Sequence, residues 1–320
     1  MKELNRDLIL FGDCRETLPL FNEKARMCVT SPPYYGLRDY GGEDKQVGLE
    51  ESPEEYIENL VEVFSKVKDC LTEDGTLWLN IGDSYYNYRP GKGQALNKQT
   101  FANNDQDLPQ DCARRGNKLE GLKEKDLIGI PWMLAFALRA DGWHLRQDII
   151  WHKPNPMPES VKDRCTKAHE YIFLLSKNKK YFYDNEAIKE PTVTKDNSNR
   201  NRDITKLNNT PGRTKMGGLK TNNYDKRNKR SVWKIATKPY KGAHFAVFPA
   251  DLIEPCILAG SEKGDLILDP FMGSGTTAMV AKTLGRDYIG CELHEDYGEL
   301  IQKRINEIPE PKEPEPTLFD

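Results

Sequence analysis

Four residues after an apolar stretch could hold a small nitrogen compound in a fixed orientation. They are Ser31-Pro32-Pro33-Tyr34, and they directly follow Ala25–Thr30. Neither proline has an N–H group, so two rigid rings hold carbonyls that act only as acceptors. The Ser31 hydroxyl and the Pro32 carbonyl could accept both N–H groups of an amine and direct its lone pair outward. The Tyr34 ring could stack on a heterocyclic base. Taken alone, such a turn also fits the plain end of a strand.

A second group of residues could bind an adenosine-containing cofactor. A predicted strand ends at Asp269 and runs into a glycine turn from which a helix opens, Pro270-Phe271-Met272-Gly273-Ser274-Gly275-Thr276-Thr277-Ala278. Gly273 and Gly275 allow a tight turn and close approach of the backbone to a ligand. Glu292 ends the next predicted strand, 19 positions after Gly273, where an acid can accept hydrogen bonds from both ribose hydroxyls.

The composition of this loop narrows the choice of ligand. It lacks the lysine of a P-loop, which argues against a nucleoside triphosphate. Ala278 replaces the third glycine of the pyrophosphate fingerprint, which by itself leaves NAD open. The acid that precedes Pro270-Phe271 suits a ligand with a cationic sulfonium or amine better than a pyrophosphate.

The apolar pattern predicts the elements that must position these residues. Strands are expected at 7–11, 25–30, 76–81, 145–151, 171–176, 265–269 and 287–291. Helices are expected at 53–71, where Ser52-Pro53 is a good start, and at 130–140, 249–259, 276–284 and 297–308. Strands that alternate with helices predict an α/β fold, a Rossmann-like, mostly parallel twisted sheet with helices on both faces.

Charged residues are unevenly distributed along the chain. Its net charge is −3, but residues 191–243 hold 14 Lys or Arg and 3 Asp, a local charge of +11. Such segregation indicates a surface for a polyanion, although a basic linker has the same composition. The segment lacks periodicity, so we expect an insertion that separates residues 1–190 from residues 244–308. Residues 87–121 are polar and predict a mobile loop, and the Pro- and acid-rich residues 309–320 predict a disordered tail.

Metal and membrane sites are not indicated. The seven cysteines are scattered and never spaced as CxxC, so we expect reduced thiols rather than disulfides or zinc ligands. The five histidines form no HxxxH or HExxH pattern, and no metal is expected. No apolar run approaches the ~20 residues of a membrane helix, and residues 1–10 lack a signal-peptide core, so a cytoplasmic location is expected.

Together, the two motifs and their order along the chain resemble the amino-methyltransferases of prokaryotic restriction–modification systems and phages, in particular the permuted β group. Ser31-Pro32-Pro33-Tyr34 looks like their catalytic tetrapeptide and Asp269–Thr277 like their cofactor loop, with the basic region between them. The resemblance implies site-specific methylation of double-stranded DNA by S-adenosyl-L-methionine, with base flipping. A cognate restriction endonuclease is a further partner it suggests, and the chain would be a monomer or homodimer.

The same resemblance assigns roles to further residues. Gly12-Asp13 would touch the cofactor's adenine or amino-acid part, and the segment containing Phe245 would pack against the cofactor. Trp151, Lys153, Pro154 and Asn155 would flank the pocket of the flipped base. Residues 191–243 would be the target-recognition region, in which Arg213, Arg227 and Arg230 are candidates for phosphate or base contacts. Trp233 is expected to anchor this region on the core.

The target base stays open between cytosine N4 and adenine N6, since both present a similar amine. Serine in the tetrapeptide is usual for the cytosine enzymes of this family, and we favour cytosine. Methylation at C5 needs a nucleophilic cysteine, usually after proline. Cys256 has this context but lies in an apolar run that predicts core packing. An RNA or protein amino-methyltransferase is a further alternative. The two intact motifs argue against an inactive DNA-binding protein, and a nicotinamide dehydrogenase fits the glycine loop but leaves Ser-Pro-Pro-Tyr unexplained.

Overall fold

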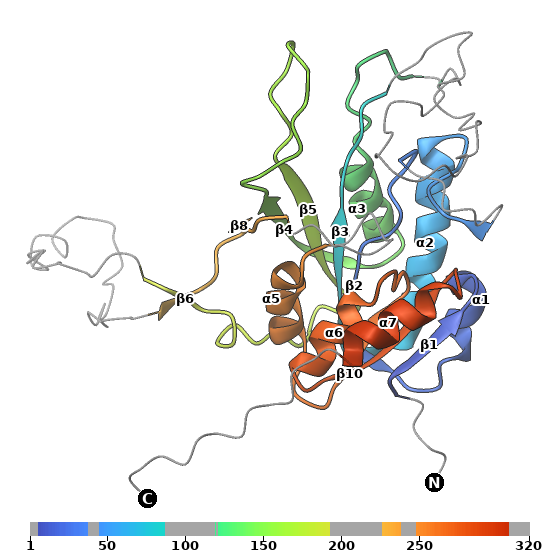
Figure 1. Ribbon diagram of the computed structural model, residues 1–320, viewed down its shortest axis with the longest axis vertical. Coiled ribbons are helices and arrows are strands. Elements are labelled where there is room, and N and C mark those ends of the chain that lie inside the picture. The colour runs from blue at the N-terminus through green and yellow to red at the C-terminus, as the bar shows by residue number, and fades with distance from the viewer. Residues whose placement is uncertain are drawn as a thin grey trace, which may run out of the picture.

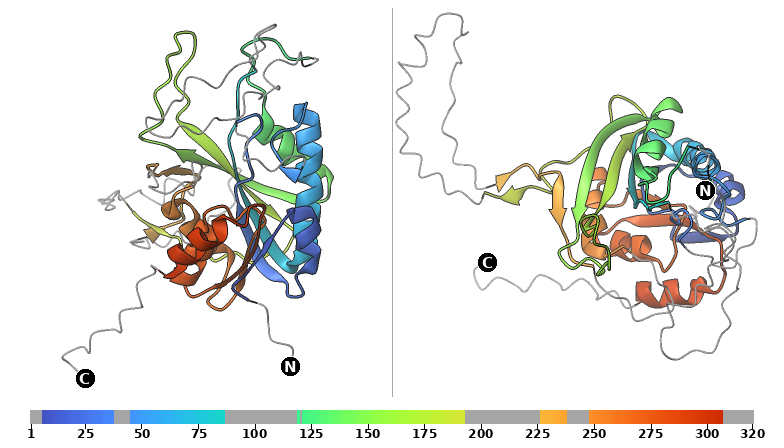
Figure 2. Two further views of the ribbon diagram at one scale, coloured as in Figure 1. Left: turned by 45° about the vertical axis from the view of Figure 1, so that its right-hand side comes forward. Right: turned by 90° about the horizontal axis from the view of Figure 1, so that it is seen from above.

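The architecture is one twisted eight-stranded sheet covered by helices on both faces (Figures 1 and 2). The computed structural model describes residues 6–37, 45–86, 119, 121–192, 226–237 and 248–306. The strand order is β1-β10-β9-β2-β3-β5-β4-β8. β1, β10, β9, β2 and β3 are parallel, whereas β5 runs antiparallel to both β3 and β4. The predicted Rossmann-like, mostly parallel sheet is therefore confirmed.

The predicted strands and helices are present, with ends that shift by a few residues. The strands that the pattern predicted are β1 Leu8–Phe11, β2 Ala25–Thr30, β3 Leu71–Ile81, β4 His144–His152, β5 His169–Ser176, β9 Leu266–Asp269 and β10 Asp287–Glu292. The longer helices are α2 Pro53–Cys70, α3 Ile130–Ala140, α5 Ala250–Gly260, α6 Thr276–Thr283 and α7 Tyr297–Asn306. The pattern did not predict α1 Cys14–Thr17 or the 3-10 turn η1 Leu18–Leu20, because each is a single turn.

Helix α2 illustrates how local sequence sets an element. Pro53 opens the helix, and the Ser52 hydroxyl accepts a hydrogen bond from the Glu55 N–H at 3.1 Å. The helix ends where Leu71 turns into β3, and the predicted start is confirmed. Its buried positions recur at helical spacing and face the sheet; they include Tyr56, Leu60, Val63, Phe64 and Val67.

Two hydrophobic clusters lie on opposite faces of the sheet. Alternate residues of β3 supply both, because successive side chains of a strand point to opposite faces. Leu77, Leu79 and Ile81 pack against α1, α2 and α3. Trp78 lies on the other face in the cluster that α5, α6 and α7 cover. Cys256 belongs to this second cluster, where burial raises the pKa of its thiol, so the prediction of core packing is confirmed.

The basic segment contributes more regular structure than its sequence suggested. The short strand β8, Val232–Lys234, pairs with β4 and completes the edge of the main sheet. Further out, β6 Glu190–Pro191 pairs with β7 Lys226–Arg227. Trp233 is buried in the second cluster and its indole N–H donates to the Arg230 carbonyl at 2.7 Å, which confirms its anchoring role. Three-residue strands carry no readable period, so the pattern missed them.

Several expectations fall on residues beyond the described ranges. They concern nearly all of the loop at 87–121, the tail at 309–320, Arg213, and Phe245 with its neighbours. No helix in the described part of the chain combines the length and apolar character that a bilayer crossing requires. Within the same ranges, no three or more His, Cys, Asp or Glu side chains are grouped to hold a metal ion.

Replacement of Trp233 tests whether β8 is part of the core. Trp233→Ala should lower the free energy of unfolding by about 3–5 kcal/mol, because it empties a buried aromatic site. The measurement is equilibrium urea unfolding. Val232→Ala is the matched control in the same strand: its side chain is 60% exposed, and we expect a change below about 0.5 kcal/mol. Similar small losses for both variants would mean that β8 is only loosely attached.

Candidate active site

The Ser31–Tyr34 turn and the loop after β9 leave the sheet side by side. β2 and β9 are neighbouring parallel strands, with Cys28 opposite Leu268. Both strands therefore end at the same edge, and the Thr30 hydroxyl donates to Asp269 Oδ1 at 2.6 Å. The two motifs, about 240 residues apart in the sequence, meet here as their chemistry requires.

Asp269 is the residue that joins them. Its carboxylate is buried and accepts three hydrogen bonds, from the Thr30 hydroxyl, from the Thr277 hydroxyl at 2.6 Å and from the Phe271 N–H at 3.0 Å. Burial raises its pKa to about 6, and the three hydrogen bonds limit that rise. The acid predicted to face a cationic ligand is thus used within the protein, and Thr277 has the same structural use.

The loop from Pro270 to Gly275 is shaped by its glycines and by helix α7. Gly273 and Gly275 have φ angles of 53° and 79°, in the region that favours glycine. A Cβ on Gly275 would lie 2.8 Å from Ile301 Cγ2, so α7 could not pack closely against any larger residue. Phe271 packs edge to face against Phe64 of α2, with ring centroids 6.5 Å apart.

Arg304 of α7 is a residue that the sequence did not single out. Its guanidinium donates to Ser274 Oγ at 2.6 Å, to the Ser274 carbonyl at 3.1 Å and to Thr276 Oγ1 at 3.0 Å. Ser274 and Thr276 were predicted to contact a cofactor, and the structure shows both side chains held by this arginine. A basic residue in the last turn of the final helix was the only signal, and it is common at helix ends.

Glu292 lies at the end of β10, next to the loop. Its two oxygens accept hydrogen bonds from the Gly273 N–H at 2.7 Å and the His294 N–H at 3.0 Å. Burial raises the pKa of Glu292 to about 7 despite backbone hydrogen bonds from His294, Gly273 and Leu293. A carboxylate has about four lone-pair positions, so Glu292 can still accept from a ligand hydroxyl.

Gly12 and Asp13 complete this part of the edge. The Gly12 N–H donates to the Glu292 carbonyl at 2.8 Å, which places the end of β1 beside the end of β10. Asp13 caps α1 and forms an ion pair with Arg15 at 2.6 Å. Burial opposes ionisation of Asp13, but the hydrogen bonds from Arg15 outweigh it and lower its pKa.

The Ser31–Tyr34 turn is clamped from two sides. The Tyr56 hydroxyl of α2 donates to the Pro33 carbonyl at 2.8 Å. Gly48 fits so closely against the turn that a Cβ there would lie 3.2 Å from the Pro33 and Tyr34 carbonyl oxygens. The Tyr34 ring rests on Gly82, where a Cβ would lie 2.6 Å from ring atom Cε2. The turn is therefore held as a rigid unit.

Side chains from β3 and β5 contact the Tyr34 hydroxyl, and Lys153, one residue past β4, lies next to them. The Tyr34 hydroxyl donates to Glu170 Oε2 at 2.8 Å, and Lys153 pairs with Oε1 of the same carboxylate. The Lys153 ammonium also lies 4.2 Å from the centroid of the Trp151 ring. Lys153, which was predicted to flank the flipped base, is thus brought to the Ser31–Tyr34 turn. Sequence reasoning missed Glu170, since a glutamate at the start of a strand has no distinctive pattern.

Other predicted contacts are engaged within the protein. Asn155 accepts from the Thr237 N–H at 2.9 Å and donates to the Thr237 carbonyl at 3.1 Å. Arg227 and Arg230 both pair with Glu190, at 3.0 and 2.8 Å. Arg230 remains two-thirds exposed on its side chain. Asn155 therefore ties Thr237 of the basic segment to the chain just after β4, and Glu190 holds the two arginines next to β6.

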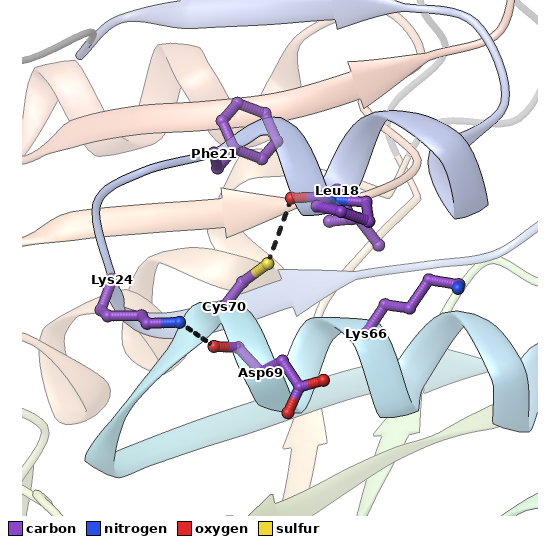
Figure 3. A pocket seen from close by; sticks show the side chains of 7 residues that line it. Leu18, Phe21, Lys24, Lys66, Asp69 and Cys70 are labelled. Carbon is purple, nitrogen blue, oxygen red and sulfur yellow. Dashed lines mark hydrogen bonds between the residues drawn. The ribbon is translucent and has the colours of Figure 1, made fainter.

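Of two cavities lined by described residues, one begins next to this site and the other is distant from it. A recess of about 400 Å³ begins at Asp83, one residue beyond Gly82, and is lined by Trp132, Lys167, His169 and Tyr171. A smaller cavity of about 160 Å³ lies between η1 and the end of α2 (Figure 3). There Cys70 Sγ contacts the Leu18 carbonyl and Lys24 binds the Asp69 carbonyl. Because it lies near the amino ends of β2 and β3, this cavity is remote from the site.

Comparisons with known proteins agree with this arrangement. A family model described as DNA methylase, for N6 and N4 methyltransferases, matches residues 25–303. The type II methyltransferase M.SmaI of Serratia marcescens is 48% identical over 298 residues, covering 93% of this chain and 90% of that protein. The type II methyltransferase M.Cfr9I of Citrobacter freundii is 47% identical over 304 residues, covering 95% and 89%.

Solved structures share the fold. The PvuII DNA methyltransferase, described as cytosine-N4-specific, superposes with a TM-score of 0.60 at 19% identity, covering 92% of this chain and 85% of that one. A putative DNA modification methylase of Thermus thermophilus, solved with S-adenosyl-L-methionine, has a TM-score of 0.56 at 22% identity and 95% coverage of both chains. The chain therefore belongs to the DNA methylase family and is an S-adenosylmethionine-dependent DNA amino-methyltransferase.

Proposed function

We propose that this enzyme methylates the exocyclic N4 amine of cytosine within a short duplex sequence, after the base has left the helix. The observation that carries the proposal is the side-by-side exit of the Ser31–Tyr34 turn and the Pro270–Gly275 loop, tied by the Thr30–Asp269 hydrogen bond. Serine in the turn, which is usual for the cytosine enzymes of this family, and a structural neighbour described as cytosine-N4-specific support cytosine over adenine.

The residues at the edge fit S-adenosyl-L-methionine. Glu292 accepts backbone hydrogen bonds and retains acceptor capacity for the ribose hydroxyls. Gly273 leaves the backbone open to a ligand at the turn, and Gly12-Asp13 adjoins Glu292. When bound, the cofactor supplies an electrophilic methyl group on a sulfonium. These residues bind and orient it.

The Ser31–Tyr34 turn acts on the nucleophile. An exocyclic amine is a weak nucleophile because its lone pair is delocalised into the ring. The Ser31 hydroxyl and the Pro32 carbonyl accept its two N–H hydrogens, which favours a tetrahedral nitrogen with its lone pair free. The clamps by Tyr56 and Gly48 keep both acceptors in place, and the Tyr34 ring is the surface on which the extruded base stacks.

The remaining parts bind and select the DNA. Residues 191–243 would be the target-recognition region, separate from residues 1–190 and 244–308, and Arg213, Arg227, Arg230, Lys153 and Asn155 are the candidates for contacts with DNA. Phe245 and its neighbours, which lie outside the described residues, would pack against the cofactor. The enzyme works in the cytoplasm as a monomer or homodimer, and it protects sites that a cognate endonuclease cuts.

The product identifies the base. Duplex DNA carrying the preferred sequence, treated with enzyme and cofactor and digested to nucleosides, should contain N4-methylcytosine by mass spectrometry.

Ser31→Ala should lower the single-turnover rate by about 100-fold or more, because one of two acceptors is lost, with cofactor affinity nearly unchanged. Ser65→Ala, whose hydroxyl donates to Asp141 at the end of α3, is the matched control. N6-methyladenine as the product would replace cytosine, and a fully active Ser31→Ala would refute the assigned chemistry.

Cofactor affinity should depend on pH through Glu292. Its raised pKa of about 7 means that the carboxylate is neutral below pH 7 and must lose its proton to accept from ribose hydroxyls. The dissociation constant of the free enzyme should rise toward about tenfold per pH unit below 7 and level off above 8. Isothermal titration calorimetry measures it. Glu292→Gln should bind weakly at pH 8 and show a flat profile, whereas the exposed neighbour variant Glu295→Gln should keep the wild-type profile. A slope that persists in Glu292→Gln would assign the titration to another acid, such as Asp269.

Arg304 should matter for the cofactor but not for DNA. Arg304→Met removes the three hydrogen bonds to Ser274 and Thr276 and keeps much of the apolar stem. We expect the cofactor dissociation constant to rise about tenfold as the loop loosens, with DNA affinity constant. Lys303→Met is the control, one residue earlier on α7. Equal effects of both variants would remove Arg304 from the site.

A further inference from the structure

The loop between β4 and β5, residues 153–168, leaves the sheet at the edge where the Ser31–Tyr34 turn lies. β5 is antiparallel to β3, so its first residues stand opposite the end of β3, next to this turn. Lys153, the first residue of the loop, pairs with Glu170, whose carboxylate accepts from the Tyr34 hydroxyl at 2.8 Å. In Figure 1 the loop extends beyond β5, away from the sheet. The loop therefore begins at the site and projects outward from it.

Hydrogen bonds hold both arms of this loop. On the outgoing arm, the Asn155 side chain accepts from the Thr237 N–H at 2.9 Å and donates to the Thr237 carbonyl at 3.1 Å. On the returning side, the Glu159 carboxylate accepts from the Arg164 guanidinium at 2.7 Å and from the Lys167 N–H at 3.0 Å. The short stretch between Asn155 and Glu159 is therefore fixed at both of its ends.

Met157 lies at the middle of that stretch, in the sequence Pro154-Asn155-Pro156-Met157-Pro158. Each proline ring fixes its own φ angle and restricts the residue before it to extended conformations, so the backbone at Met157 is stiff. The Met157 side chain is 76% exposed, more than any other large apolar side chain in the described ranges. Its burial in a partner would release hydrophobic free energy with little further loss of backbone entropy.

The charge of the loop favours DNA as that partner. Residues 153–168 hold four Lys or Arg and two Asp or Glu, a local charge of +2. Both acids are paired with cations, Glu159 with Arg164 and Asp163 with Lys125, each at 2.7 Å. A positive loop attracts phosphates, and it continues the edge at which the base is methylated. A second copy of this chain would bring the same positive charge to the contact and would be repelled.

We propose that Met157 inserts into the base stack of the DNA and takes the place that the target base leaves. The inference rests on the proposed function, because it assumes that the base leaves the helix. Extrusion of a base costs the free energy of its pairing and stacking. Apolar side chains, methionine among them, insert between base steps in other DNA complexes. The inserted thioether contacts the neighbouring bases and keeps the target base from returning, without touching the reacting nitrogen.

Methylation of matched and mismatched duplexes tests this role. Met157→Ala should lower the single-turnover rate on a matched duplex by about tenfold, because the extruded state loses its support. With the target base in a mismatch, the loss should be less than about threefold, since a mispaired base leaves the stack at lower cost. Met157→Leu keeps an apolar side chain of similar size and should retain at least about half of the wild-type rate. Val161→Ala is the matched control in the same loop, with a side chain that is 37% exposed, and its rate should equal the wild-type rate.

The fluorescence of 2-aminopurine at the target position reports whether the base is stacked. Saturating wild-type enzyme should raise this fluorescence, and Met157→Ala should give a rise that is at least about twofold smaller. Equal rate losses on matched and mismatched duplexes would show that Met157 is only a general DNA contact. Equal fluorescence with both proteins would show that the base leaves without its help. A dimer that Met157→Ala dissociates in analytical ultracentrifugation, with an unchanged rate, would assign the side chain to a contact between two copies. Each of these three results would overturn the proposal.

Failure of the proposed function gives a different result. The methylated nucleoside made by the wild-type enzyme reports the base, and N6-methyladenine would move the same series to adenine without affecting Met157. No rise in 2-aminopurine fluorescence with the wild-type enzyme would contradict the extrusion step of the proposed function. A wild-type rise that Met157→Ala reproduces in full would leave the proposed function standing and remove only this role of Met157.

Discussion

The site depends on the hydrogen bonds that the buried Asp269 carboxylate accepts. It receives the Thr30 hydroxyl from the strand that leads into the Ser31–Tyr34 turn and the Thr277 hydroxyl from the helix that follows the Pro270–Gly275 loop. Two segments from opposite ends of the chain are thereby fixed to one group of atoms. Burial of a carboxylate costs free energy unless hydrogen bonds compensate it. Loss of either threonine hydroxyl would therefore also weaken the hydrogen bond that the other threonine makes to Asp269.

Much of the fold could be predicted, because its determinants are local. Apolar periodicity gave the main strands and long helices, and alternation of the two gave the sheet type. The reversed strand β5 looks the same as a parallel one in sequence, since direction depends on the chain's path and not on side-chain pattern. β8 was missed because its pairing with β4 is a contact between distant segments.

The residues of the site can likewise be separated into those that the sequence could predict and those that it could not. The Ser31–Tyr34 turn, the glycine loop and Glu292 have backbone or chemical requirements that leave a readable spacing. Arg304, Tyr56 and Glu170 are ordinary residues on ordinary elements, and their importance comes from where folding brings their polar atoms. Sequence places a polar side chain near a loop but does not give the direction in which it points. The hydrogen bonds within the protein at four predicted cofactor contacts could therefore not be foreseen; these are Asp269, Ser274, Thr276 and Thr277.

The antiparallel pair of β6 and β7 has a consequence for how such enzymes diversify. The chain leaves the sheet after Pro191 and returns at Lys226, at adjacent points held by Glu190 and its two arginines. The two ends of the intervening stretch are therefore fixed next to each other. Since the entropy of closing a loop grows only slowly with its length, that stretch can be exchanged or lengthened with little cost to folding. The length and composition of this stretch can therefore change while the fold of the main sheet stays constant.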